Sequence, residues 1–281
     1  MASLPIATQP PIGFGPGSQT EGADGLAYLP MPSGMRVYEP HLPEVEDKAR
    51  YGAAFAALDE VQRALEGWKP GDHASVSLNG FDAANRRLID EALGEGEVAV
   101  RVSGGGAPLE IQEATFAGVW RVRGTEGVDR IEVGAFPRGA LLRAFPAHWE
   151  IDLADTARPR SGVVNAPPII AEIAHRTEGR VPGTPAHVIN FSLLPHTPED
   201  LALIDAAVGV GGLTILSRGY GNCRIDAAAR RDVWRVRYYN STDMLILDTL
   251  EITDLPEVAC AAPEDIADSA ERLAEVLRAM R

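Results

Sequence analysis

Trp120-Arg121-Val122-Arg123 returns as Trp234-Arg235-Val236-Arg237, 114 residues further along the chain. The six-residue pattern Glu-Gly-x-x-Pro-Gly also occurs twice, at 66–71 and at 178–183, with an offset of 112 residues. In each case the pattern breaks a helix with glycine and starts a turn with Pro-Gly. These paired motifs indicate that one folding unit occurs twice in the chain.

A third match lies between these two. Leu88-Ile89-Asp90 returns as Leu203-Ile204-Asp205, at an offset of 115 residues. The three matches keep the same order, and their offsets differ by no more than a short loop insertion. Two copies make a duplication, whereas a solenoid needs a longer series of repeats.

Each copy predicts the element order α-β-α-β-β-β. Apolar residues at helical spacing from Ala54 to Leu65 predict the opening helix, and Asp82 and Thr197 are good N-caps for the second helix. The expected strands lie at 73–79 and 98–102 in the first copy, and at 186–193, 213–216, 233–239 and 244–252 in the second. We expect the middle β-α-β to form a right-handed parallel crossover and the last two strands to form an antiparallel hairpin. The fold class is therefore α+β, an internal duplication with mixed sheets.

The chain divides into five segments. Residues 1–40 hold seven prolines and six glycines, which predicts an extended tail. The first repeat unit spans 41–140, a linker spans 141–165, and the second unit spans 166–262. Apolar residues at helical spacing predict an amphipathic C-terminal helix at 263–281. Its apolar face docks on the body or, alternatively, enters a groove of a partner.

Composition limits the classes of function. The 281 residues carry a net charge of −14, which argues against nucleic acid or an anionic membrane surface as partner. The chain has two cysteines and no apolar run long enough to span a membrane. Residues 1–35 contain no lysine or arginine and no apolar core of a secretory signal. The expected location is the cytoplasm.

Two glycine-rich bends occupy equivalent positions, at 104–106 and 219–221. Neither continues as Gly-Lys-Ser/Thr and neither opens a helix, so neither is a phosphate-binding or dinucleotide-binding loop. The histidines show no metal-ligand or nucleophile spacing. The residues predict a binding protein with no catalytic site, no metal and no resident cofactor.

The second copy carries an arginine-rich segment that the first copy lacks. Six arginines lie between Arg218 and Arg237, against only Asp226 and Asp232. Such a segment is either a contact surface or a network paired with the acids of the same chain. The candidate partner-binding residues are Arg218, Gly219, Tyr220, Gly221, Asn222, Cys223, Arg224, Arg235, Arg237, Tyr239 and Asn240.

Cys223 and Cys260 form the candidate thiol site. They are too few for a zinc site and are not spaced as Cys-x-x-Cys. They are either buried structural thiols or a reactive pair, in which the arginines near Cys223 would favour its thiolate.

The longest motifs of the second copy resemble those of the HupH/HyaF/HoxQ family of hydrogenase expression/formation proteins. They read LSRGYGNCRI at 216–225, VWRVRYYNS at 233–241, LILDTLE at 245–251 and PEVACAAPEDI at 256–266. The resemblance implies a chaperone for the iron–sulfur small-subunit precursor of a membrane-bound [NiFe] uptake hydrogenase. It also implies a thioredoxin-like accessory protein as a second partner, and it supplies no catalytic residues. The alternative is a factor that carries or protects a transient iron–sulfur cluster through Cys223 and Cys260.

Overall fold

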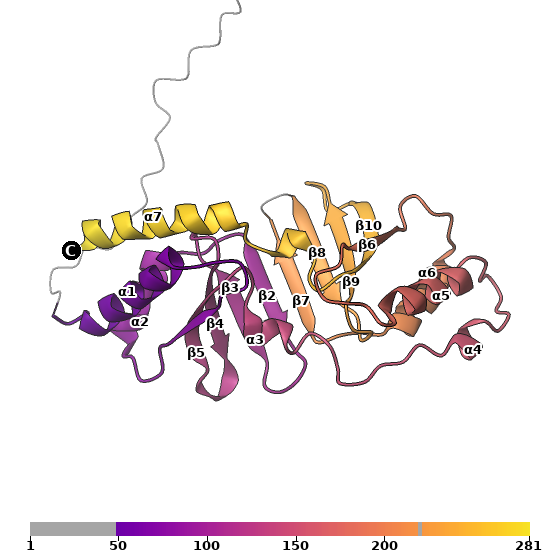
Figure 1. Ribbon diagram of the computed structural model, residues 1–281, viewed down its shortest axis with the longest axis horizontal. Helices are drawn as coiled ribbons and strands as arrows, with labels where there is room; N and C mark the ends of the chain where they lie inside the picture. The colour runs from indigo at the N-terminus through magenta and orange to yellow at the C-terminus, as the bar shows by residue number, and fades with distance from the viewer. Residues whose placement is uncertain (1–48, 219–220) are drawn as a thin grey trace, which may run out of the picture. The chain divides into compact units, whose positions relative to one another are not determined.

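The computed structural model describes residues 49–218 and 221–281. The tail expected at 1–40 and two of the candidate residues, Gly219 and Tyr220, lie outside the described residues. A single ten-stranded sheet runs through the described chain (Figure 1). Its strands and helices are α1 (Gly52–Glu66), β1 (Ala74–Ser77), α2 (Ala83–Leu93), β2 (Val98–Val102), β3 (Leu109–Glu113), β4 (Val119–Gly124), β5 (Asp129–Val133), α3 (Arg138–Leu141), α4 (Leu153–Thr156), α5 (Ala166–Thr177), β6 (His187–Asn190), α6 (Pro198–Val208), β7 (Leu213–Ser217), β8 (Asn222–Ala227), β9 (Val233–Tyr239), β10 (Leu245–Ile252) and α7 (Pro263–Met280). Short 3-10 turns lie at Thr125–Gly127 and Glu257–Ala259.

The strand order repeats the duplication. It runs β1-β5-β4-β3-β2 in the first copy and continues β7-β8-β9-β10-β6 in the second. Each strand of the first copy therefore has a counterpart at the same distance from the junction between β2 and β7. Both copies have the same internal strand order, as the paired motifs predict.

The prediction of mixed sheets is wrong, because every strand pair in the described chain is antiparallel. The β1-α2-β2 crossover joins strands that run in the same direction but lie at opposite edges of their unit, with three strands between them. Each copy also has one strand more than expected, β3 and β8. In β8 the side chains alternate between buried and exposed positions, but its charged residues and the preceding glycines favoured a loop.

The predicted helix starts are confirmed. The Asp82 carboxylate accepts the N–H of Asn85, and Thr197 forms a capping box with Asp200 at the start of α6. Gly94 and Gly209 end the two equivalent helices with φ of 61° and 68°, a backbone region that glycine enters at little cost.

The two faces of the sheet have different covers. On the face that we call the helix face, α1 and α2 pack over the β1 end, and α5 and α6 pack over the β6 end. The central strands β3, β2, β7 and β8 lie between these two helix pairs (Figure 1). The opposite, inner face carries an apolar cluster around Trp120 and Trp234, covered by the segments around Ala140 and Ala259.

The C-terminal helix docks on the body, so its apolar face is not free for a partner groove. α7 lies alongside α1 (Figure 1). The buried side chains of α7, from Ile266 to Met280, belong to the same apolar core as those of α1. The side-chain amide of Gln62 on α1 donates to the carbonyl oxygen of Ala270 on α7 at 2.9 Å. Within the described residues, no helix combines the length and apolar character that a membrane span requires.

The segment 141–165, expected as a linker, is packed against both copies. Arg143 donates hydrogen bonds to the carbonyl oxygens of Gly104 and Ala107, at 2.7 and 2.6 Å. The indole of Trp149 donates to the carbonyl oxygen of Ala207.

Candidate functional site

The arginines of the repeated Trp-Arg-Val-Arg motif form ion pairs on the helix face. In the first copy Arg121 pairs with Asp90 at 2.8 Å and with Asp129 at 2.5 Å. The Leu-Ile-Asp motif supplies Asp90, so two of the three repeated motifs meet in one ion pair. This network ties α2 to β4 and β5.

The second copy repeats this network. Arg235 forms two hydrogen bonds to Asp248, at 2.5 and 2.6 Å, and reaches Asp205 at 3.3 Å. Its guanidinium lies 4.2 Å from the ring centroid of Phe191, a distance that permits a cation–π interaction. Arg235 is therefore a structural residue of α6, β9 and β10 as well as a predicted contact residue.

A further ion-pair cluster is specific to the second copy. Arg224 donates to both carboxylate oxygens of Asp226, at 2.8 and 3.0 Å, and Arg237 donates to the same carboxylate at 2.5 Å. Thr214 adds a hydrogen bond at 2.8 Å. Burial would raise the pKa of Asp226, but the hydrogen bonds from Arg224, Thr214 and Arg237 hold it below its usual range. The arginine-rich segment is therefore in large part paired with acids of the same chain, while Arg224 stays half-exposed.

A hollow of about 350 Å³ brings five of the predicted site residues together at the ends of β7, β8 and β9. Its lining residues are Leu216, Ser217, Arg218, Asn222, Cys223, Arg224, Tyr239 and Asp243. The backbone accounts for this convergence, because Ser217 pairs with Cys223 and Asn222 pairs with Tyr239 across the sheet. Arg235 and Arg237 lie further along the helix face and line a neighbouring hollow with Arg224.

The predicted residue Asn240 has a role in the turn between β9 and β10. Its side-chain oxygen accepts the backbone N–H groups of Thr242 and Met244 at 2.9 Å, and the Thr242 hydroxyl at 2.8 Å. This is the way an asparagine stabilises a tight turn. Its side-chain oxygen is therefore occupied inside the hairpin.

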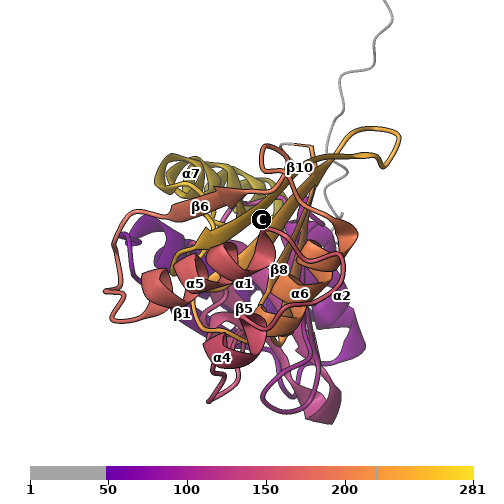
Figure 2. The same ribbon diagram turned by 90° about the vertical axis from the view of Figure 1, so that its right-hand side faces the viewer.

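The apolar residues from Met244 into the start of β10 were not predicted as site residues. Met244, Leu245 and Ile246 are 65%, 50% and 61% exposed, and Leu216 in the adjoining hollow is 47% exposed. The turn that precedes β10 stands out from the body (Figure 2). Three successive apolar residues were the signal, because a strand with one buried face buries only alternate side chains.

The two thiols are not activated. Burial raises the pKa of Cys223 to about 11, and burial together with Glu257 raises the pKa of Cys260 to about 11. The expectation that arginines near Cys223 favour its thiolate is wrong, because Cys223 faces the inner core while Arg224 points to the helix face. In the described part of the chain, no group of three or more histidine, cysteine or acidic side chains is placed to hold a metal ion.

Comparison with known proteins gives the family. The family model described as "HupH hydrogenase expression protein, C-terminal conserved region" matches two segments, 52–150 and 163–280. The first segment covers most of the first repeat unit, and the second segment contains the whole of the second unit. The chain belongs to this family of hydrogenase expression proteins.

Full-length relatives support the assignment. The hydrogenase expression/formation protein HupH of Rhodobacter capsulatus is 56% identical, over 97% of this chain and 98% of its own. The protein HoxQ of Cupriavidus necator is 48% identical, over 99% and 98% of the two chains. The hydrogenase-1 operon protein HyaF of Escherichia coli is 35% identical, over 94% of each chain. A solved structure, HupH from Thiobacillus denitrificans, is 31% identical and covers 43% of this chain and 98% of its own, with a TM-score of 0.37.

Proposed function

We propose that this chain is a non-catalytic chaperone in hydrogenase maturation. It binds the iron–sulfur small-subunit precursor of a membrane-bound [NiFe] uptake hydrogenase in the cytoplasm, before the clusters are complete and before export. A thioredoxin-like hydrogenase accessory protein is its second partner. The names of the relatives, hydrogenase expression/formation proteins, support a role in making a hydrogenase.

The observation that carries the proposal is the exposed apolar run 244–246 beside the hollow of Arg224 and Tyr239. Exposed apolar residues next to arginine and tyrosine are typical of protein interfaces. We call the surface formed by Leu216, Arg224, Tyr239, Met244 and Ile246 the hairpin patch. Its mixed chemistry fits an incompletely folded polypeptide that still exposes apolar segments.

The first copy provides an internal comparison. Its equivalent hairpin joins β4 to β5 through the short turn Thr125–Gly127, and its strands have 6 and 5 residues, against 7 and 8 for β9 and β10. The longer strands and the apolar run are therefore additions to the second copy. Because the first copy folds in the same topology without them, the fold itself does not require them.

The test is binding of the purified precursor to the full chain and to a variant that carries Met244→Ser and Ile246→Ser. We expect the precursor to bind the wild type and to bind the variant at least about tenfold more weakly, since buried apolar anchors dominate interface energies. Leu142→Ser is the matched control, because Leu142 is also an exposed apolar residue but lies beside α3. Equal binding by the wild type and the hairpin variant, with both folded, would remove the hairpin patch from the proposal. No binding of the precursor to the wild type would overturn the proposal itself.

A further inference from the structure

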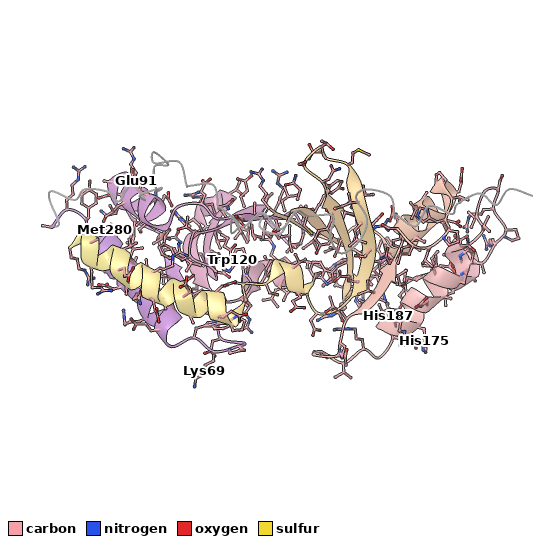
Figure 3. All side chains as sticks on the ribbon, turned by 90° about the horizontal axis from the view of Figure 1, so that it is seen from above. Lys69, Glu91, Trp120, His175, His187 and Met280 are labelled. Carbon is pink, nitrogen blue, oxygen red and sulfur yellow. The ribbon has the colours of Figure 1, made fainter. Side chains whose placement is uncertain are left out.

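A cavity of about 570 Å³ lies between the α2–β2 loop, the end of β3 and the segment that leads into α7. Figure 3 shows α7 and the segment before it from above. Its lining residues are Glu95, Gly96, Glu97, Val98, Glu113, Ala114, Thr115, Ala117, Ser217, Val258, Ala259, Cys260, Ala261 and Asp265. Apart from the protonated thiol of Cys260, its titratable side chains are all carboxylic acids, and lysine, arginine and histidine are absent from this lining.

Glu113 is the buried member of this set. Its side chain is on the inner face of β3 and the residue is 8% exposed, whereas Glu95, Glu97 and Asp265 are exposed. Its Oε1 accepts the N–H of Gly118 at 3.3 Å, and within the described residues its second oxygen, Oε2, accepts no hydrogen bond. Burial, with a smaller contribution from the charges of Glu97 and Asp265, raises the pKa of Glu113 to about 7 against the opposing hydrogen bond from Gly118. A buried carboxylate with a single hydrogen bond destabilises a fold.

The second copy indicates that the fold does not need these acids. By the motif offsets and the strand register, Glu95, Glu97 and Glu113 correspond to Val210, Gly212 and Ala227. In the second copy, the loop between α6 and β7 contacts the segment that follows α3 directly. The N–H of Gly212 donates to the carbonyl oxygen of Ala144 at 2.7 Å. A Cβ on Gly212 would lie 2.6 Å from the carbonyl oxygen of Arg143, so this contact leaves no room for a side chain.

We propose that this cavity binds an arginine side chain of a partner polypeptide, whose guanidinium pairs with Glu113 and with the carboxylates of Glu97 and Asp265. Arginine fits better than lysine because its planar group offers five N–H donors and gives up its hydration more readily. The inference rests on the proposed function in one respect, because the arginine belongs to a polypeptide that the chain binds. This arginine supplies the cation that Glu113 lacks among the described residues of the chain.

The probe is the peptide acetyl-Gly-Arg-Gly-amide, titrated into the full chain at pH 7.5 and followed by the backbone amide signals of Gly96 and Gly118. The isosteric peptide with citrulline in place of arginine has no charge. We expect saturable shifts with the arginine peptide, and at least about tenfold weaker binding with citrulline or with Glu113→Gln, since a paired charge is lost in each case. Glu110→Gln is the matched control, because Glu110 lies on the same strand but on the opposite face, exposed.

Proton linkage gives a second readout. Binding of the arginine peptide should tighten from pH 6 to pH 8 as Glu113 loses its proton, and this dependence should vanish in Glu113→Gln. No saturable shift, equal binding of the citrulline peptide, or unchanged binding by a folded Glu113→Gln variant would each overturn the inference. Displacement of the peptide by micromolar Zn²⁺ would also overturn it and assign the cavity to a metal. The precursor plays no part in this experiment, so its outcome is separate from that of the proposed function.

Discussion

Val100 on β2 pairs directly with Ile215 on β7, and the two are equivalent residues of the two copies. An approximate two-fold axis therefore passes between them, at the centre of the ten-stranded sheet. Both side chains are buried in the same inner core as Trp120 and Trp234. The two indoles make equivalent hydrogen bonds, to the carbonyl oxygens of Gly134 and Thr253 at 2.9 and 3.1 Å. The copies thus share a sheet and a core.

The shared core predicts that the two copies unfold together. Ile215→Ala should lower the free energy of unfolding by about 2–5 kcal/mol, the range for an aliphatic side chain removed from a core. Because β2 and β7 close the same core, calorimetry should show one transition that moves to lower temperature as a whole. Two separate transitions, of which only one responds to the substitution, would show that the copies fold independently.

The equivalent ion pairs of Arg121 and Arg235 predict structural roles for both arginines. Arg235→Met should lower the free energy of unfolding by about 3–5 kcal/mol, because it leaves the buried carboxylate of Asp248 without its partner. Arg121→Met removes the equivalent pair but should lower the free energy of unfolding less, because Asp129 keeps its ion pair with Arg86 at 2.8 Å. Arg231→Met is the control, because Arg231 is exposed and its contact with Asp232 is 3.8 Å, so we expect a change near zero. Urea denaturation measures all three, and an Arg235→Met variant as stable as the wild type would contradict the assigned role.

Much of the fold followed from the sequence because the motifs act locally. Asp82, Thr197 and the glycines that follow each helix set the helix boundaries through hydrogen bonds to their own neighbours. The strand order could not be predicted, because pairing β1 with β5 instead of β2 depends on contacts between distant segments. The exposed apolar residues 244–246 at the start of β10 were missed, although three apolar residues in succession were a signal for them.

Several of the candidate partner-binding residues lie together in the fold. The sequence identified Arg218, Asn222, Arg224 and Tyr239, which the sheet register brings to one hollow. The acidic cavity was missed because its acids, Glu95, Glu97, Glu113 and Asp265, come from three stretches of chain that only the fold brings together. A comparison of the two copies could have found it, since Glu113 stands where the second copy has Ala227.

Glu113 predicts a pH dependence of stability. Its pKa is raised from 4.5 to about 7, so the folded chain holds a proton that the unfolded chain releases. The stability contribution of this group is fully present below pH 4.5 and is lost as pH rises toward 7. Deprotonation of Glu113 should lower the free energy of unfolding by on the order of 3 kcal/mol. Glu113→Gln should therefore raise the melting temperature at pH 8 and change it little at pH 4.5. Equal melting temperatures of the two proteins at pH 8 would show that the carboxylate is already stabilised.

The raised thiol pKa values predict slow cysteine chemistry. With a pKa of about 11 for Cys223 and Cys260, the thiolate fraction at pH 8 is roughly a hundredfold below that of an ordinary cysteine. Labelling with a chromogenic disulfide should be correspondingly slow in the folded chain and fast in urea. Replacement of both cysteines by alanine should leave precursor binding nearly unchanged. Loss of small-subunit maturation with normal folding and binding would instead support a cluster-carrying role for the thiols.

The hairpin patch predicts which arginine and tyrosine contribute to binding. Arg224 and Tyr239 line one hollow, and residues of these two types most often dominate interface energies. Replacing both by alanine should weaken precursor binding by about 2–4 kcal/mol. The fold should survive, because Asp226 keeps its hydrogen bonds from Arg237 and Thr214.

The first copy supplies the matched control for that substitution. By the strand register, Arg224 and Tyr239 correspond to Glu110 and Thr125. Alanine at Glu110 and Thr125 should leave precursor affinity within about twofold, since single exposed contacts outside an interface contribute little. Calorimetric titration with the precursor, together with melting curves for both variants, separates binding from stability. If the two double variants bind equally well, the ion pairs of Arg224 serve the sheet alone and the partner docks elsewhere.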